Sequence, residues 1–277
     1  MEYQKFDLKL YGTSLYGWYT QPNTLKGVVV LVHGMGEHSG RYLNSVIPKL
    51  LESGMAVVAY DNIGHGKSGG KRGHCPNYKA LMDILEAVLL KARTLFSEKP
   101  LFLYGHSMGG NLVLNYALRH DFEIDGLVVS SPYLRLAFVP PKWKMVLGKI
   151  MLHIFPSLTL PSGLDARGIS RIAEEVKAYK ADELIHDKVS PMFSFPIMDA
   201  GEWVIQNANR LKVKTLLLHG TADPIIDHKA TISFHEMANH SSLKLYEGGY
   251  HELHHDRCKD EVLAHIQDWF QEQLTAS

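Results

Sequence analysis

Residues 101–110 read LFLYGHSMGG and join a strand-like run to a helix-like one. The apolar run Leu101–Tyr104 is typical of a buried strand, and Asn111–Leu118 after the glycines has helical spacing. The glycines two residues before and after Ser107 complete the pattern G-x-S-x-G at the junction. A sharp strand-to-helix turn of this kind holds a serine in strained backbone angles, at a helix N-terminus whose amides favour negative charge. Although five such residues can match by chance in a structural turn, this context predicts Ser107 as a nucleophile.

Strand-like and helix-like segments alternate along most of the chain. Four further runs rich in apolar or β-branched residues predict buried strands, and three further segments have helical spacing. The strands are Val28–Val32, Ala56–Tyr60, Leu127–Val129 and Thr215–Leu218, and the helices are Tyr42–Leu51, Leu81–Phe96 and Val262–Leu274. This alternation predicts an α/β fold, in which a mostly parallel central sheet has helices on both faces.

Two regions depart from this rhythm. Phe6–Leu10 and Ser14–Tyr19 alternate polar and apolar residues around a turn, which predicts a hairpin at an antiparallel edge of the sheet. Between about residues 133 and 200, six prolines divide helical pieces and no buried strand is evident. We therefore predict a single domain over residues 1–277, with a helical cap, or lid, inserted at about 133–200.

The composition restricts the class of protein. The 277 residues include 29 Lys and Arg against 29 Asp and Glu, so no net charge attracts the chain to nucleic acid. Cys75 and Cys258 are expected to be free thiols. The N-terminus is charged where a signal peptide would be apolar, and no apolar run is long enough to span a bilayer. We expect a cytoplasmic protein, or one that lies on a membrane surface, without a nucleic-acid partner.

A serine nucleophile needs an imidazole to take its proton and a carboxylate to orient the imidazole. Asp223 follows the strand Thr215–Leu218, and His251 follows Leu243–Glu247, which is the next strand-like run. The order Ser, Asp, His is expected when all three project from the C-terminal edge of one α/β sheet. We predict Asp223 as the acid and His251 as the general base. The neighbouring Asp227 lies where a helix would begin, which predicts an N-cap.

A glycine-rich segment, HGMGEH at residues 33–38, follows the strand Val28–Val32. Its glycines allow backbone amides to face a cavity, although a purely structural turn is the alternative. In such sites one N–H comes from the residue after the nucleophile and the other from the loop after an earlier strand. We predict that the amides of Met35 and Met108 form an oxyanion hole.

Taken together, these motifs resemble the α/β-hydrolase fold, and within it the monoacylglycerol lipase and lysophospholipase family. The resemblance covers nearly the whole chain, and five segments carry it in the family's order: residues 33–42, 61–68, 105–110, 219–223 and 246–254. It implies a serine carboxylic-ester hydrolase that releases a fatty acid and glycerol from a monoacylglycerol through an acyl-enzyme, without metal or cofactor. Lysophospholipids and simple carboxylic esters are the alternative substrates, and a small peptide stays open because the same triad attacks amides.

The resemblance also implies contacts with a lipid ester substrate. Carried over position by position, Glu37, Arg41, Tyr179 and His254 would lie near its polar head, and the inserted segment would act as a lid. Within that segment, apolar residues at positions 143, 147, 150, 151 and 154 share one helical face. Such a face can lie on a membrane or cover the protein's own core, and both alternatives remain open.

Residues 251–255 read HELHH, which matches the zinc-protease pattern H-E-x-x-H. That site needs both histidines one turn apart on a regular helix, whereas here the motif directly follows a strand and two glycines. We therefore predict no metal site. A non-catalytic binding protein on the same scaffold is the third class, and the presence of all three triad residues in the sequence argues against it.

Overall fold

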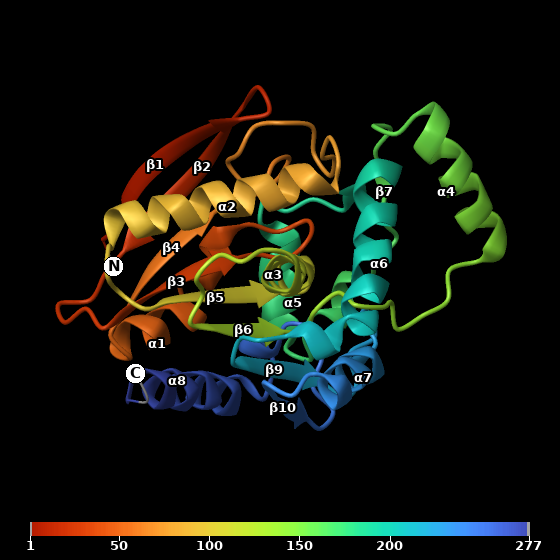
Figure 1. Cartoon of the computed structure of the whole chain (residues 1–277). Helices are drawn as coiled ribbons and strands as arrows, with labels where there is room; N and C mark the ends of the chain where they lie inside the picture. The colour runs from red at the N-terminus through yellow and green to blue at the C-terminus, as the bar shows by residue number, and fades with distance from the viewer. Residues whose placement is uncertain (1, 276–277) are drawn as a thin grey trace.

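An eight-stranded sheet forms the centre of the computed structural model, which describes residues 2–275 (Figure 1). The order across the sheet is β1-β2-β4-β3-β5-β6-β9-β10. β2 pairs antiparallel with β1 and β4, and all other neighbours in this sheet are parallel. The strands are β1 (Gln4–Leu10), β2 (Thr13–Thr20), β3 (Gly27–Val32), β4 (Met55–Tyr60), β5 (Leu101–His106), β6 (Gly126–Ser130), β9 (Thr215–Gly220) and β10 (Ser241–Tyr246). The predicted mostly parallel sheet with an antiparallel hairpin at one edge is confirmed.

Helices cover both faces of the sheet and enclose one apolar core on each. One core contains residues of α2 (Tyr78–Leu95), α3 (Met108–Arg119) and α7 (His228–Met237). The other contains residues of α1 (Val46–Glu52) and α8 (Lys259–Thr275). Successive side chains of β3 point into the two cores in turn, so the whole strand is buried. Its sequence is therefore a continuous apolar run.

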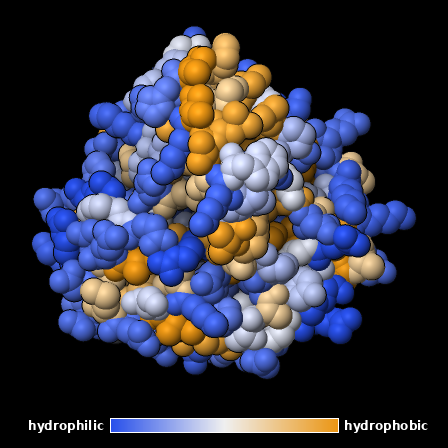
Figure 2. Space-filling view, turned by 90° about the vertical axis from the view of Figure 1, so that its right-hand side faces the viewer, coloured by the Kyte–Doolittle hydropathy of each residue, from blue (hydrophilic) through white to orange (hydrophobic). Residues whose placement is uncertain are grey.

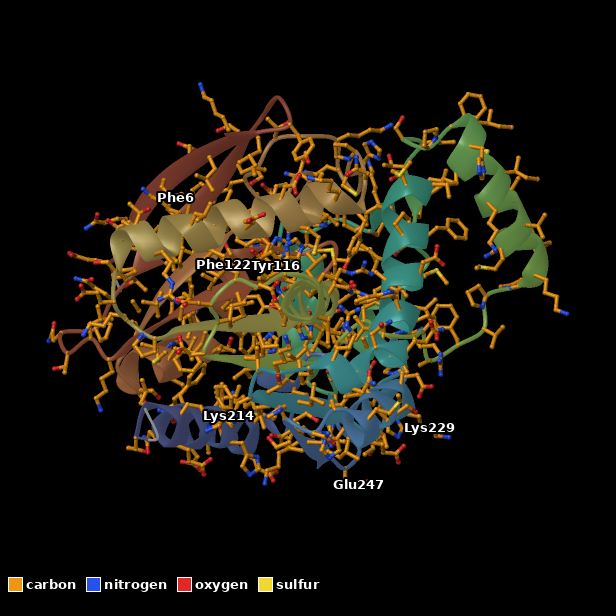
Figure 3. All side chains as sticks on the ribbon, viewed as in Figure 1. Phe6, Tyr116, Phe122, Lys214, Lys229 and Glu247 are labelled. Carbon is orange, nitrogen blue, oxygen red and sulfur yellow. The ribbon has the colours of Figure 1, made fainter. Side chains whose placement is uncertain are left out.

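Side chains fill the space on both faces of the sheet (Figure 3). Tyr116 of α3 packs edge-on against Phe122, with ring centroids 6.3 Å apart. The charged side chains of Lys229 and Glu247 are exposed at the lower edge of this view. The loops that follow β3, β5, β9 and β10 project from this sheet and its two helical layers.

The segment between β6 and β9 contributes no strand to the main sheet. It contains α4 (Lys142–Ile154), α5 (Ala173–Ala181) and α6 (Pro191–Gln206), and a short pairing of β7 (Leu160–Pro161) with β8 (Lys188–Val189). Figure 1 shows α4 outside α6, at the edge of the molecule. No helix within residues 2–275 combines the length and apolar character needed to cross a bilayer.

Two helix starts differ from the sequence prediction. The predicted helix Tyr42–Leu51 is wrong in its first turn, because Ser39–Tyr42 forms a short 3-10 turn and α1 begins at Val46. Hydrogen bonds to Glu37 hold the side chains of Arg41 and Tyr42 in that turn. α2 begins at Tyr78 rather than Leu81, since the side chain of Asn77 caps it by accepting from Ala80 N (2.8 Å).

The predicted N-cap at Asp227 is confirmed. Its carboxylate accepts from the backbone N–H of Lys229 (3.0 Å) at the start of α7. This contact explains Asp227 without a catalytic role and leaves Asp223 as the carboxylate at the end of β9.

Candidate active site

Ser107 lies at the turn between β5 and α3, with φ of 52° and ψ of −115°. A non-glycine residue rarely adopts such angles, and it does so here because the surrounding chain enforces them. A Cβ atom on Gly105 would lie 2.5 Å from the carbonyl oxygen of Gly109, and one on Gly109 would lie 2.0 Å from that of Val32. The predicted strand-to-helix turn is confirmed, and both glycines are required by close backbone contacts.

Asp223 and His251 come from the loops after β9 and β10 and meet beside this turn. Asp223 Oδ2 lies 2.7 Å from His251 Nδ1. The two loops approach closely at Gly220, where a Cβ atom would lie 2.2 Å from the carbonyl oxygen of Gly249. Because the carboxylate faces Nδ1, that nitrogen carries the proton and Nε2 remains free to accept one. Ser131 donates its hydroxyl to the carbonyl oxygen of His251 (2.8 Å) and steadies this loop.

Burial and ion pairing act in opposite directions on these two groups. Burial alone would raise the pKa of Asp223, but His251 and His219 outweigh it and hold that pKa well below its usual range. Burial alone would lower the pKa of His251, but the charge of Asp223 outweighs it and the pKa of His251 is raised. The pair therefore holds an ionised carboxylate beside an imidazole of increased basicity.

The raised pKa of His251 leads to a prediction about the pH dependence of activity. A general base must be neutral to accept a proton, so kcat/KM should fall as His251 becomes protonated at low pH. Because the pKa is raised, the midpoint of this acid limb should lie above the ordinary histidine value of about 6.5. Kinetics on a water-soluble ester, with circular dichroism at each pH to verify folding, measure it. A midpoint at or below that value would contradict the assignment of His251.

Met35 and Met108, whose amides we predict as the oxyanion hole, lie in two segments next to Ser107, and Met35 lines the same cavity as that serine. Met108 is the first residue of α3, and Met35 lies in the loop after β3. Within residues 2–275, neither N–H donates a hydrogen bond. The loop is shaped by His33, whose Nδ1 lies 2.7 Å from the carbonyl oxygen of Gly34 and whose Nε2 accepts from Asn62 N (2.9 Å).

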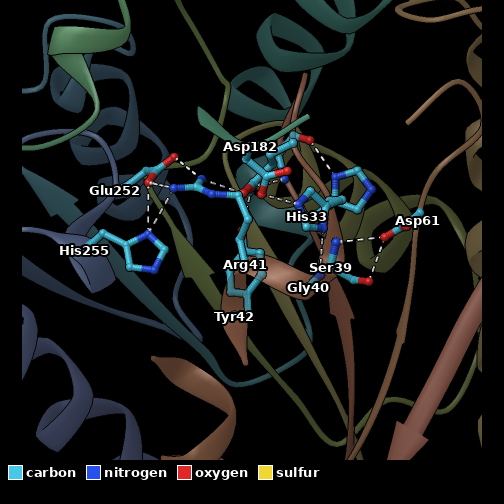
Figure 4. A network of polar contacts seen from close by, with 12 residues as sticks. His33, Ser39, Gly40, Arg41, Tyr42, Asp61, Asp182, Glu252 and His255 are labelled. Carbon is cyan, nitrogen blue, oxygen red and sulfur yellow. Dashed lines mark hydrogen bonds and ion pairs between the residues drawn. The ribbon is translucent and has the colours of Figure 1, made fainter. Parts of the chain in front are cut away.

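A buried polar cluster lies beside the loop after β3 (Figure 4). Glu37 Oε1 accepts from the hydroxyl of Tyr42 (2.7 Å), and Glu37 Oε2 accepts from Arg41 (2.9 Å). The Arg41 guanidinium also binds both oxygens of Glu252, the residue after the predicted base. Burial alone would raise the pKa of Glu37, but Arg41 outweighs it and lowers that pKa. The cluster ties the loop after β3 to the loop that carries His251.

The resemblance placed four residues near the substrate's polar head: Glu37, Arg41, Tyr179 and His254. The structure brings them together, two at the cavity surface and two behind it. Glu37 and Tyr179 line the main cavity, whereas Arg41 and His254 do not. Arg41 lies over the ring of Tyr179, with 4.8 Å between Cζ and the ring centroid. His254 is buried and stacks on Tyr42 at 4.9 Å.

The main cavity is about 560 Å³ in volume and opens onto Ser107 and His251. Most of its wall comes from the segment between β6 and β9, including Leu136, Met145 and Phe195. Volumes of this size and apolar walls with a few polar groups are typical of small-molecule sites. The predicted nucleophile and base therefore share a cavity that suits an apolar substrate.

The HELHH motif has a geometry unlike that of a zinc protease. Leu253–His255 form one 3-10 turn, and His251 precedes it and is paired with Asp223. Glu252, His254 and His255 have ligand atoms within 4.8 Å of one another. The guanidinium of Arg41, however, binds both Glu252 oxygens, and a second cation there would be repelled. This arrangement favours the serine chemistry.

Two residues of this site have contacts that no sequence pattern predicts. In the sequence, Glu252 stands out only within the HELHH motif, and His219 only within the segment 219–223. Glu252 binds Arg41 across 211 positions of sequence, so no local pattern indicates that contact. His219 lies near the end of β9, four residues before Asp223, and no local sequence pattern indicates their contact.

Two features define a serine hydrolase of the α/β-hydrolase fold: Ser107 lies at a sharp strand-to-helix turn, and a paired aspartate and histidine follow two later strands. The family model for serine aminopeptidases of the S33 family matches residues 23–258, so the chain belongs to this family. The predicted fold class and enzyme class are thereby confirmed.

Three relatives illustrate the similarity. An abhydrolase domain-containing protein of Dictyostelium discoideum is 35% identical over 89% of this chain, and the chain spans 26% of that protein. A monoacylglycerol lipase of Mycolicibacterium smegmatis is 30% identical over 94% of this chain and 93% of its own length. The crystal structure of a Paleococcus ferrophilus monoacylglycerol lipase has 36% identity and a TM-score of 0.85, and the match covers 94% of this chain and 99% of that one.

Proposed function

We propose that this protein is a monoacylglycerol lipase, which hydrolyses the ester bond to release a fatty acid and glycerol. The observation that carries the proposal is the meeting of Ser107 and the Asp223-paired His251 at one end of a largely apolar cavity of about 560 Å³. Relatives of similar length that are named as monoacylglycerol lipases support it. Lysophospholipid and general carboxylic-ester hydrolysis are the alternatives.

In the proposed cycle, Ser107 Oγ attacks the acyl carbonyl carbon while His251 Nε2 takes its proton. The amides of Met35 and Met108 stabilise the oxyanion, and His251 then protonates the departing glycerol oxygen. Water repeats these steps on the acyl-enzyme and releases the fatty acid. Within residues 2–275, the Ser107 hydroxyl makes no hydrogen bond to His251. Such contacts often tighten only when substrate binds, and here the serine side chain would turn toward Nε2.

For the glycerol head, Glu37 and Tyr179 are the contacts that this proposal assigns. Both line the cavity wall that also carries Ser107. Arg41 would position them, because it binds Glu37 and lies over the Tyr179 ring. His254 would support the same region by packing between Tyr42 and His106.

The segment at about 133–200 would act as the lid, with α4 in peripheral contact with a membrane. No residue of α4 is buried, and Trp143, Leu147, Ile150 and Ile154 are 48–65% exposed. The opposite side of α4 packs on α6, where a Cβ atom on Gly148 would lie 2.7 Å from Phe195. Figure 2 shows apolar residues gathered on this side of the molecule. Because the apolar face of α4 points outward, it supports contact with lipid and not a role in covering the protein's core. The enzyme would then be cytoplasmic and would meet its substrate at a membrane surface.

Changing Leu147 and Ile150 together to glutamate should lower the hydrolysis of a long-chain monoacylglycerol in vesicles by about tenfold or more. The reason is that each aliphatic side chain buried in lipid contributes about 1.5–3 kcal/mol of binding. Hydrolysis of p-nitrophenyl acetate in solution should remain near that of the wild type. Leu90→Glu on α2, a side chain that is 55% exposed, is the matched control. Equal losses on both substrates, or no loss in vesicles, would refute the membrane contact.

A substrate panel tests the proposed function directly. It contains monoacylglycerols of several chain lengths, lysophospholipids, p-nitrophenyl esters and aminoacyl amides, and kcat/KM is measured for each. We expect the highest value on a monoacylglycerol, because the cavity combines apolar walls with polar side chains near Ser107. A higher value on a lysophospholipid or an aminoacyl amide than on every monoacylglycerol would overturn the proposal.

A further inference from the structure

A second histidine binds the carboxylate of the proposed catalytic acid. His219 is the second-last residue of β9. Its Nε2 lies 3.1 Å from Asp223 Oδ2, which is the oxygen that also faces His251. Its other ring nitrogen, Nδ1, lies 2.8 Å from the hydroxyl oxygen of Thr231 on α7. The side chains of His219 and Thr231 are fully buried.

The hydrogen-bonding capacity of Asp223 determines the direction of these contacts. Oδ1 accepts from the backbone N–H groups of Ile225 (2.8 Å) and Ile226 (3.0 Å), and Oδ2 faces the two histidines. An ionised carboxylate only accepts, so His219 must donate through Nε2–H. With that proton on Nε2, Nδ1 can accept from the Thr231 hydroxyl. The contacts therefore run in one direction, from Thr231 through His219 to Asp223.

We propose that His219 is a positioning residue for ester hydrolysis, which holds Asp223 Oδ2 in line with His251 while His251 gains and loses a proton. This inference rests on the proposed function. The backbone amides of Ile225 and Ile226 bind only Oδ1 of Asp223. A separate hydrogen bond is therefore needed to fix the position of Oδ2. His219 supplies that anchor from β9, and Thr231 fixes the rotation of its ring from α7.

His219 also moderates the electrostatics of the pair. Each donor to a carboxylate reduces the negative charge available to its other partners, so His219 weakens the pull of Asp223 on the His251 proton. The other titratable groups around His251 are Glu37, Glu252 and His106, and His228 faces His219 with ring centroids 6.3 Å apart. None of these four has a hydrogen bond to Asp223 within residues 2–275. A change at His219 therefore acts on His251 through Asp223.

The test compares His219→Leu with His219→Gln. Loss of a hydrogen bond to a charged group corresponds to about a tenfold to hundredfold loss of kcat for His219→Leu. KM should stay near the wild-type value, because His219 is outside the cavity wall. The acid limb of kcat/KM should move to higher pH, since Asp223 then attracts the His251 proton more strongly. Glutamine can donate its amide N–H to Oδ2, and it should restore most of kcat and return the limb toward its original position.

Two further variants separate positioning from folding. His235→Leu removes a histidine on α7 that lies 2.7 Å from the Ser241 hydroxyl, away from Asp223, and should stay within about twofold of wild-type kcat. If His219→Leu fails to fold, as thermal unfolding would reveal, Thr231→Val tests the same chain of contacts. It should lower kcat and leave KM unchanged, whereas Thr231→Ser should retain activity.

The results distinguish this inference from the proposed function. Wild-type kcat and an unshifted acid limb in His219→Leu would overturn the positioning role, as would a glutamine variant as impaired as the leucine variant. If His219→Leu does not fold, a wild-type kcat in Thr231→Val would overturn the positioning role instead. None of these outcomes affects Ser107. Retained activity in Ser107→Ala would instead refute the proposed function, whatever His219 does.

Discussion

Replacement of Ser107 by alanine should lower monoacylglycerol turnover by about 10⁴-fold or more and leave the protein folded. The substitution removes only the attacking oxygen and keeps the Cβ atom in the same strained backbone. The main-chain bonds of this turn remain, since Ser107 N donates to Ser130 and Ser107 O accepts from Asn111 and Tyr133. The small remaining rate would come from the oxyanion amides and substrate binding.

Steady-state kinetics on purified wild type and Ser107→Ala measure this effect, with the thermal unfolding midpoint as a control for folding. A loss of less than about tenfold would show that the nucleophile is a different residue, because one decade corresponds to only about 1.4 kcal/mol of barrier. If Ser107→Ala shows a large loss together with a much lower unfolding midpoint, the loss could come from misfolding. Ser107→Cys, with an intact fold, would then replace it as the test of the Ser107 hydroxyl.

Asp223→Asn should have the next largest effect, a loss of about 10⁴-fold in kcat. The amides of Ile225 and Ile226 need an acceptor at Oδ1, so the new NH₂ group must occupy the position of Oδ2. There it faces His251 Nδ1 as a donor and drives the ring proton to Nε2. An imidazole with its proton on Nε2 cannot accept the serine proton, so the base is lost while the shape of the site is kept.

The matched control for this prediction is Asp227→Asn. Asparagine caps helices as well as aspartate does, so this variant should retain stability and stay within about twofold of wild-type kcat. Comparable losses at both positions would show that the loop after β9 is merely fragile. Retained activity in Asp223→Asn would exclude Asp223 as the orienting acid.

The parts of the fold that the sequence predicts best are those decided by local contacts. The strand–serine–helix turn is predictable because Gly105 and Gly109 meet backbone atoms directly, and no other residue would fit. The central strand β3 is predictable because burial on both faces demands a continuous apolar run. Asp227 is predictable because capping is a contact over two residues.

The features that the sequence does not reveal depend on distant partners. Arg41 and Tyr42 form a 3-10 turn because both side chains bind Glu37, and helical spacing alone gives no sign of this. The apolar face of α4 has the same pattern whether it covers a core or faces outward, and only its packing on α6 distinguishes the two. The role of His219 emerges only when β9 and α7 place it between Thr231 and Asp223.

Reaction with a fluorophosphonate tests whether Ser107 carries out lipid-ester hydrolysis. The treated protein is digested and the modified residue is located by mass spectrometry, while monoacylglycerol turnover is followed in parallel with and without a chelator. We expect one equivalent of label on Ser107, loss of turnover in proportion to labelling, and no effect of the chelator. Turnover that survives complete labelling, or that the chelator abolishes, would contradict the account.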